Sequence, residues 1–178
     1  MKKLLCLILS ILLLAGLCGC KDGSTFEVRN LFFNTPARKK FLKKPSGEAT
    51  EITNLVQRLI LANPNVAIKY TSNNNLIFNS QGFGLESAIF AVYDKNTLAN
   101  CKKINWFYRD IEVEGYVGNK NFTKPNRTYQ TSIVNGRYVS NTTISMAVQR
   151  AFEKYLTTRA YPFFVLNVKV PFDKIDVN

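Results

Sequence analysis

The sequence predicts an α+β fold in which amphipathic helices are combined with antiparallel hairpins. Apolar residues recur at three- and four-residue spacing between positions 46 and 62, as they do on one face of a helix. Turn-forming residues at Ser72–Asn75 and at Asn135-Gly136 each separate two short runs with the composition of strands. With 46% apolar and 12% aromatic residues in 178, the chain can bury a hydrophobic core.

The first long helix is expected from Ser46, as its N-cap, to about Ala62, and Pro64 stops it because the residue before a proline disfavours helix. Its apolar face comprises Ile52, Leu55, Val56, Leu59 and Ile60. The further expected elements are strands at 66–70 and 76–78, a helix at 85–93, strands at 103–108, 111–117, 129–134 and 137–139, a helix at 142–156 and a strand at 162–170. Gln81-Gly82-Phe83-Gly84 interrupts the pattern and marks the best domain boundary.

Two stretches of the second half bear on nucleic-acid binding. Trp106 alternates with Tyr108 in the strand at 103–108, which is more typical of packing than of a platform for bases. Residues 120–127 are polar, with three basic residues and no acid, so an exposed loop is expected there.

Residues 1–20 differ in composition from the rest and are expected to form an apolar leader helix. Lys2 and Lys3 precede the apolar run Leu4–Leu14, and Leu17-Cys18-Gly19-Cys20 resembles a lipobox with Cys20 as the lipid-bearing residue. The run is short compared with the ~20 apolar residues of a membrane-spanning helix. This layout is typical of a bacterial lipoprotein signal peptide.

The net charge indicates the class of partner, and the absence of histidine excludes several kinds of catalytic and metal site. The net charge of +12 indicates an anionic partner, either nucleic acid or an acidic membrane surface. Without histidine, Ser-His-Asp and Cys-His catalytic devices and His-bearing metal sites are excluded. Three of the four cysteines lie in the first twenty residues, so neither a disulfide framework nor a metal site is implied.

The most informative segment is the basic stretch from Gly23 to Leu42. It begins as a strand around Phe26 and ends as a helical turn, with Thr35 as N-cap and Pro36 at the first helical position. Physically it can be an edge strand followed by a solvated basic helix. Its sequence, GSTFEVRNLFFNTPARKKFL, closely resembles a signature of the MutL family of DNA mismatch repair proteins. Gly19-Cys20-Lys21-Asp22-Gly23 resembles the run that precedes this signature, an interpretation that competes with the lipobox.

The resemblance extends over residues 19–178. The stretches NRTYQTSIVNGRYV, YPFFVLNV and DKIDVN resemble the second domain of MutL, a β-α-β domain like domain 2 of ribosomal protein S5. The resemblance therefore implies three parts: a leader at 1–20, the C-terminal part of a GHKL-type ATPase α/β sandwich at 21–82, and a C-terminally truncated S5-like domain at 83–178.

The resemblance also implies ATP, with Mg²⁺, as the family's cofactor. Gly23 and Ser24 correspond to the residues that close the phosphate end of the nucleotide pocket. Nothing in this sequence resembles the helix with the general-base glutamate, the Asp-x-Gly loop, the glycine-rich lid or the later ATP-binding lysine. We therefore expect no catalytic residue, no ATP hydrolysis by this polypeptide and no nucleotide binding of consequence, although the family is one of ATPases.

DNA is the second partner that the resemblance implies. The candidate contacts to phosphate are Arg137, Lys120, Lys124, Arg127, Arg38, Lys39 and Lys40, with Lys43 and Lys44 beside them, and each can equally be a solvated surface charge. Family members carry a basic residue shortly after the VNGR hairpin. Here Ser140-Asn141-Thr142-Thr143 is neutral, so weak binding without sequence preference is expected.

Three functions remain open from the sequence. The first is a mismatch repair protein, cytoplasmic and associated with the nucleoid, acting with MutS and a repair endonuclease or helicase. The second is a membrane-anchored lipoprotein whose basic body binds a partner outside the membrane. The third is a chimaeric fragment without independent function. No stable dimer of the family type is expected for this polypeptide.

Overall fold

The computed structural model describes residues 29 and 32–174, which fall into two compact units divided after Leu42. The described part of the first unit contains helix α2 (Pro36–Lys39), with Thr35 at the N-cap and Pro36 at its start, as predicted. The Thr35 side chain makes no capping hydrogen bond. The predicted leader, the strand around Phe26, Cys20, Gly23 and Ser24 lie outside the described residues.

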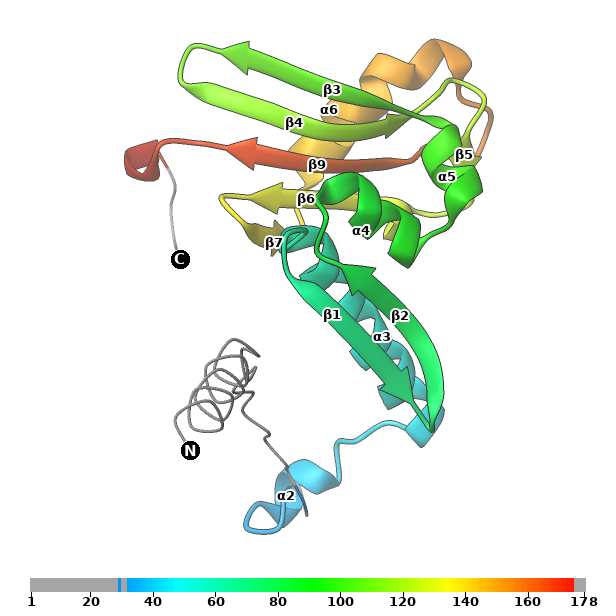
Figure 1. Ribbon diagram of the computed structural model, residues 1–178, viewed down its shortest axis with the longest axis vertical. Helices are drawn as coiled ribbons and strands as arrows, with labels where there is room; N and C mark the ends of the chain where they lie inside the picture. Colours follow the sequence, from blue (N-terminus) through cyan, green and yellow to red (C-terminus); the bar gives the residue numbers. More distant parts are fainter. Residues whose placement is uncertain (1–28, 30–31, 175–178) are drawn as a thin grey trace, which may run out of the picture. The chain divides into compact units, whose positions relative to one another are not determined.

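The second unit contains the remaining described elements (Figure 1). They are α3 (Pro45–Ala62), β1 (Ala67–Ser72), β2 (Asn75–Gln81), α4 (Leu85–Val92), α5 (Lys95–Ala99), β3 (Cys101–Tyr108), β4 (Ile111–Gly118), β5 (Thr123–Lys124), η1 (Arg127–Tyr129), β6 (Gln130–Val134), β7 (Arg137–Val139), α6 (Thr142–Phe152), η2 (Glu153–Tyr155), β8 (Tyr161–Pro162), β9 (Phe164–Lys169) and η3 (Phe172–Lys174). The predicted α+β class is confirmed.

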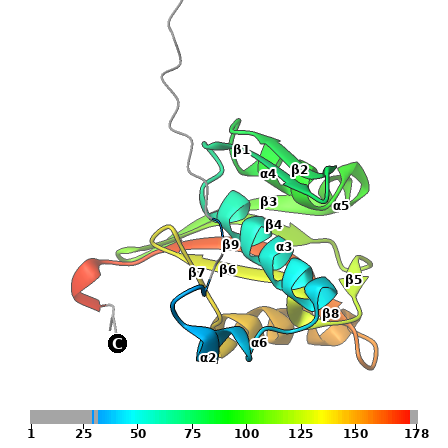
Figure 2. The same ribbon diagram turned by 90° about the horizontal axis from the view of Figure 1, so that it is seen from below.

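A five-stranded mixed sheet with the order β3-β4-β9-β6-β7 forms the centre of this unit. Its neighbours are antiparallel except β6 and β9, which are parallel. A parallel pair needs a crossover connection, and α6 supplies it between β7 and β9. Figure 2 shows α6 on one face of the sheet and α4 with the β1–β2 hairpin on the other.

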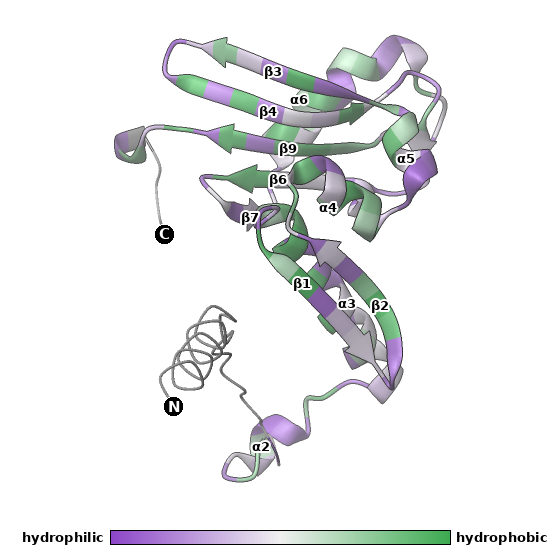
Figure 3. Ribbon diagram, viewed as in Figure 1, coloured by the Kyte–Doolittle hydropathy of each residue, from purple (hydrophilic) through white to green (hydrophobic). Residues whose placement is uncertain are grey.

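The hydrophobic core lies on the face of the sheet towards α3 and α4. Its buried members are Ile60, Leu61, Phe78, Ala88, Ile89, Tyr116, Ile133, Phe163 and Val165. The central strand β9 begins with a hydrophobic run, Phe164–Leu166, whereas β6 is apolar only at its end, at Ile133 and Val134 (Figure 3). On the opposite face α6 has no fully buried residue, and an open groove of about 870 Å³ separates it from β3 and β4. The sheet is therefore packed tightly on one face only.

Helix α3 differs from its predicted form in two ways. It begins at Pro45, with Lys44 as the N-cap, because proline suits the first helical position. Of the predicted apolar face, Ile60 is buried, whereas Ile52, Leu55 and Leu59 are about half exposed. The buried stripe is thus rotated towards Ile60 and its neighbour Leu61.

Two further differences concern short elements. The loop predicted at 120–127 contains strand β5, which pairs with β8. Helix α5 is not predicted by periodicity; it begins where the Asp94 carboxylate accepts a hydrogen bond from the Thr97 backbone N–H. Among the helices of the described ranges, none has the length and apolar character needed to cross a bilayer.

Candidate nucleic-acid interface

The seven predicted DNA-contacting cations are divided between the two units. Arg38, Lys39 and Lys40 are exposed on and beside α2 in the first unit. Lys120, Lys124, Arg127 and Arg137 belong to the second unit, where their surroundings differ strongly.

Lys124 lies against aromatic rings and is half-buried. Its Nζ is 4.3 Å from the ring centroid of Phe122, 5.0 Å from that of Tyr129 and 6.0 Å from that of Phe163. A cation over the face of a ring is attracted by the ring quadrupole, most strongly when water is partly excluded. Lys124 therefore acts as an internal cation that holds β5 against the core, which differs from the exposed loop position expected.

The positive charge of Lys124 also acts on nearby titratable groups. The pKa of the Asp94 carboxyl is lowered, mainly by the hydrogen bond from the Thr97 backbone and in smaller part by Lys124. Burial raises the pKa of the Cys101 thiol to about 11, although the charge of Lys124 opposes this shift. Cys101 is thus a protonated and weakly nucleophilic thiol at neutral pH.

Replacement of Lys124 by glutamine is expected to lower the free energy of unfolding by about 1–2 kcal/mol, because the cation–ring attraction is lost in a partly desolvated place. The affinity for DNA should change less than about twofold, since an ammonium held by rings is a poor phosphate contact. Urea denaturation and DNA titration measure the two effects. Lys124→Arg, which keeps the cation, is the control, and a larger effect on DNA binding than on stability would contradict this assignment.

Lys120 and Arg127 are exposed but also contact aromatic side chains. The Lys120 Nζ is 5.8 Å from the ring centroid of Tyr155. The Arg127 Nη2 donates to Gln149 Oε1 over 3.2 Å, and its guanidinium carbon lies 5.3 Å from the ring centroid of Tyr161. Arg127 is therefore oriented by α6 and β8 while part of its guanidinium remains open to solvent.

A small polar pocket lies where Arg127 approaches the start of α6. It has a volume of about 170 Å³. Its lining residues are Arg127, Gln130, Ser132, Tyr138, Val139, Ser140, Asn141, Thr142 and Ser145. Hydroxyl groups predominate and no carboxylate lines it. Because the N-terminus of a helix carries partial positive charge and unpaired N–H groups, the pocket suits an anion.

The neutral segment before α6 is part of this pocket. Asn141 is the N-cap of α6, and its Oδ1 accepts a hydrogen bond from the Ile144 N–H over 3.0 Å. The Asn141 side chain is therefore occupied by capping, whereas Ser140 and Thr142 of this segment can bond a phosphate together with Arg127.

Arg137 lies at the start of β7, directly after the Asn135-Gly136 turn. Its side chain is exposed and makes no hydrogen bond or ion pair within residues 29 and 32–174. Asn135 fixes this hairpin to the sheet, since its amide donates to Val170 O and accepts from Val170 N at 2.8 and 2.9 Å. Arg137 is thus a solvent-facing cation on a rigid support.

The sequence pointed to the charges of this site and to the hydroxyl groups before α6, but not to Tyr138 and Ser145. Tyr138 and Ser145 line the pocket from β7 and α6, and Arg58 of α3 stacks over the Tyr138 ring at 4.3 Å. No short motif joins these positions, so only the fold brings them together. Within the described ranges no group of three or more Cys, Asp or Glu residues could hold a metal ion.

The sequence of the chain matches that of known proteins. Residues 89–178 match the family model described as the C-terminal domain of DNA mismatch repair protein. The chain is 41% identical over 161 residues to the DNA mismatch repair protein MutL of Clostridium tetani, covering 90% of this chain and 26% of that protein. It is 38% identical over 162 residues to MutL of Thermoanaerobacter pseudethanolicus, with the same coverage. The chain thus spans about a quarter of the length of these relatives.

Solved structures agree in fold. The N-terminal domain of a DNA repair protein superposes with a TM-score of 0.67 at 21% identity, over 83% of this chain and 50% of that chain. The ATPase domain of the mismatch repair endonuclease MutL of Aquifex aeolicus superposes with a TM-score of 0.60 at 22% identity, over 85% of this chain and 53% of that chain. The chain belongs to the MutL family of DNA mismatch repair proteins.

Proposed function

We propose that this chain contributes DNA binding, without sequence preference, to a mismatch repair protein. The single observation that carries the proposal is the pocket at the start of α6, where Arg127, hydroxyl groups and a helix N-terminus meet without a carboxylate. Arg137 adds an exposed cation on the hairpin that precedes α6. Phosphate contacts of this kind position a protein on DNA and carry no sequence information.

We also propose that residues 21–82 are the end of an ATPase domain and that residues 83–178 are the S5-like second domain. The family match at residues 89–178 supports the second assignment. Arg38, Lys39 and Lys40 then lie in the ATPase part, whereas Arg127 and Arg137 lie in the second domain. Because residues 140–143 carry no charge, we propose that binding is weaker than in relatives with a basic residue there.

We expect the affinity for duplex DNA to fall as the salt concentration rises, with Arg137 as one of the phosphate contacts. Arg137→Ala should lower the affinity about three- to tenfold and reduce the slope of log affinity against log salt by about 1, because one phosphate contact is lost. Titration of a fluorescent duplex between about 50 and 200 mM salt measures both effects.

Lys69→Ala is the matched control for this experiment. Lys69 is an exposed cation on β1, so its loss removes the same charge from a different part of the surface. Equal effects of the two substitutions would show that net charge, and not the surface around α6, determines binding.

For ATP, we propose that the family's nucleotide chemistry is not performed by this polypeptide on its own. By the family resemblance, Gly23 and Ser24 correspond to the phosphate edge of the nucleotide pocket, and a serine hydroxyl can donate to a phosphate oxygen but cannot activate water. Measurement of ATP turnover by the purified 178-residue chain tests this. Turnover above that of a mock preparation would sink the idea.

Partners and location follow from the family. We propose that MutS and a repair endonuclease or helicase are the protein partners, and that the protein acts in the cytoplasm at the chromosome. The names of the MutL relatives, all DNA mismatch repair proteins, support this.

A further inference from the structure

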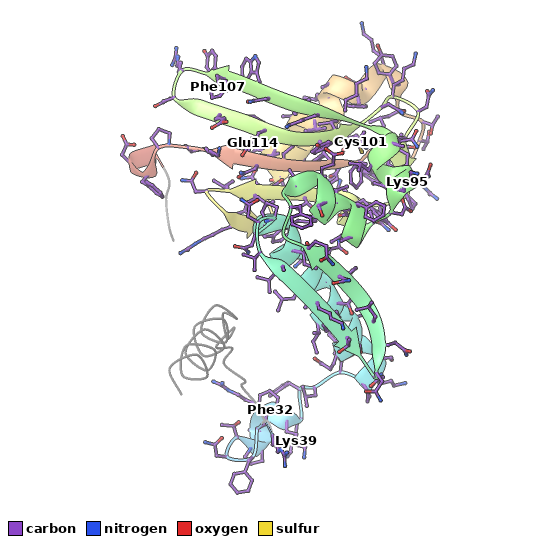
Figure 4. The ribbon with its side chains drawn as sticks, in the orientation of Figure 1. Phe32, Lys39, Lys95, Cys101, Phe107 and Glu114 are labelled. Atoms are coloured by element: carbon purple, nitrogen blue, oxygen red, sulfur yellow. The ribbon has the colours of Figure 1, made fainter. Side chains whose placement is uncertain are left out.

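The β3–β4 hairpin exposes three consecutive aromatic side chains at the edge of the sheet. Trp106, Phe107 and Tyr108 are 58%, 63% and 52% exposed. Large aromatic side chains usually contribute to a core, and contiguous exposed ones mark binding surfaces. Figure 4 shows Phe107 near the tip of this hairpin and Glu114 further along it.

Trp106 and Tyr108 form an ordered pair. Successive side chains of a strand alternate between faces, so these two lie on one face and Phe107 lies on the other. Their ring centroids are 5.7 Å apart and the rings are almost parallel, at 2°. The Arg109 guanidinium carbon lies 5.3 Å from the Tyr108 ring centroid. Two stacked rings and a planar cation thus extend along one face of the hairpin.

The acidic side chains of strand β4 lie on the face of the β3–β4 hairpin opposite to the aromatic pair. Trp106 pairs with Val113 across the hairpin, and directly opposed residues share a face, so Glu112 and Glu114 project to the far face. There both carboxylates pair with Lys169, at 3.1 Å each. On the aromatic face the charged residue of β3 is Lys102, whereas Asp110 belongs to the exposed turn beside Arg109.

The aromatic face continues into the groove beside α6. That groove is lined at its charged positions by Lys102 and Lys120, and by no carboxylate. An anionic chain that stacked on the aromatic pair would therefore meet positive charge along the same face. Aromatic platforms next to basic grooves are the common means of binding single-stranded nucleic acid, because every base has a π-face.

We propose that Trp106 and Tyr108, with Arg109 and Lys102 beside them, form a stacking platform for unpaired bases of single-stranded DNA. The class of partner rests on the proposed function, but the residues are different from those around α6. Unlike the phosphate contacts, this platform distinguishes single strands from duplex, because bases within a duplex are already stacked on each other. The two rings already stack on each other, so little side-chain freedom must be lost on binding.

Trp106 is the only tryptophan of the chain and therefore reports directly on its own stacking. Addition of a short oligothymidylate to the full chain should quench its fluorescence, whereas a duplex of the same length should leave it nearly unchanged. Trp106→Ala and Tyr108→Ala should each lower the affinity for the oligothymidylate about five- to tenfold, as expected for the loss of one stacked base. Duplex affinity should change less than about twofold.

Phe107→Ala is the matched control, since it removes a neighbouring ring of similar exposure from the opposite face. An equal loss of oligothymidylate affinity in Phe107→Ala would overturn the platform. The platform would also be overturned if Trp106→Ala bound the oligothymidylate as tightly as the unchanged chain. If that variant also associated with itself less than the unchanged chain does, the edge would be an interface between copies of the chain. If Arg137→Ala weakens duplex binding while Trp106→Ala leaves single-strand binding intact, the platform fails and the proposed function stands. If neither DNA binds, the proposed function fails as well.

Discussion

Replacement of Gly115 by alanine is expected to lower the free energy of unfolding by about 3 kcal/mol or more. Gly115 lies in the middle of β4, opposite Ile104 of β3 and Leu166 of β9. Its φ of 147° is one that L-residues rarely adopt. A Cβ placed there would lie 2.1 Å from the Val165 carbonyl oxygen. The obstacle is backbone, so no side-chain rotation can relieve it.

Gly136→Ala separates conformational strain from this steric clash. Gly136 also has a positive φ, of 78°, but a Cβ there would meet nothing within 4 Å. The free energy of unfolding should therefore fall by only about 1–2 kcal/mol, the cost of a positive φ in alanine. Urea denaturation of both variants provides the comparison. Similar losses would mean that β4 and β9 can separate freely at Gly115, contrary to their close approach.

Elements with local signals could be predicted from the sequence. Asn73 and Asn74 adopt φ values of 49° and 62°, and Asn135-Gly136 adopts 47° and 78°, as the two turns require. Helix α6 was predicted from its periodicity, although it ends at Phe152 and continues as a 3₁₀ turn. Helix α5 has only five residues, too few for an apolar pattern, and its one signal is the capping Asp94.

Contacts between distant segments could not be predicted in the same way. Lys124 belongs to a polar, basic stretch, and it is half-buried because its neighbours Phe122 and Tyr129 meet the distant Phe163 around it. For Trp106 and Tyr108, the interpretation as packing residues was wrong: both are more than half exposed, because no other element of the described residues covers that end of the hairpin. For the candidate site, the sequence supplied the cations, whereas the pocket depends on how β7, η1 and α6 converge.

Phe163→Ala is the second substitution with a large expected effect. Phe163 is completely buried, directly before β9, and its ring makes edge-on contacts with Tyr93 at 5.0 Å and Phe122 at 5.8 Å. Truncation removes these contacts and leaves a cavity, so the free energy of unfolding should fall by about 3–5 kcal/mol.

The same cluster holds Lys124, so a cavity at Phe163 should also loosen β5 and with it the segment that leads to Arg127.

Phe163→Leu fills most of the space and should recover a large part of the lost free energy of unfolding. Phe107→Ala, at an exposed ring, should change stability by no more than about 0.5 kcal/mol. Urea denaturation with an unchanged m-value is the measurement. A loss below about 1.5 kcal/mol in Phe163→Ala would mean that the surrounding rings collapse into the space, and that the cluster is not a rigid support for the proposed DNA-binding surface.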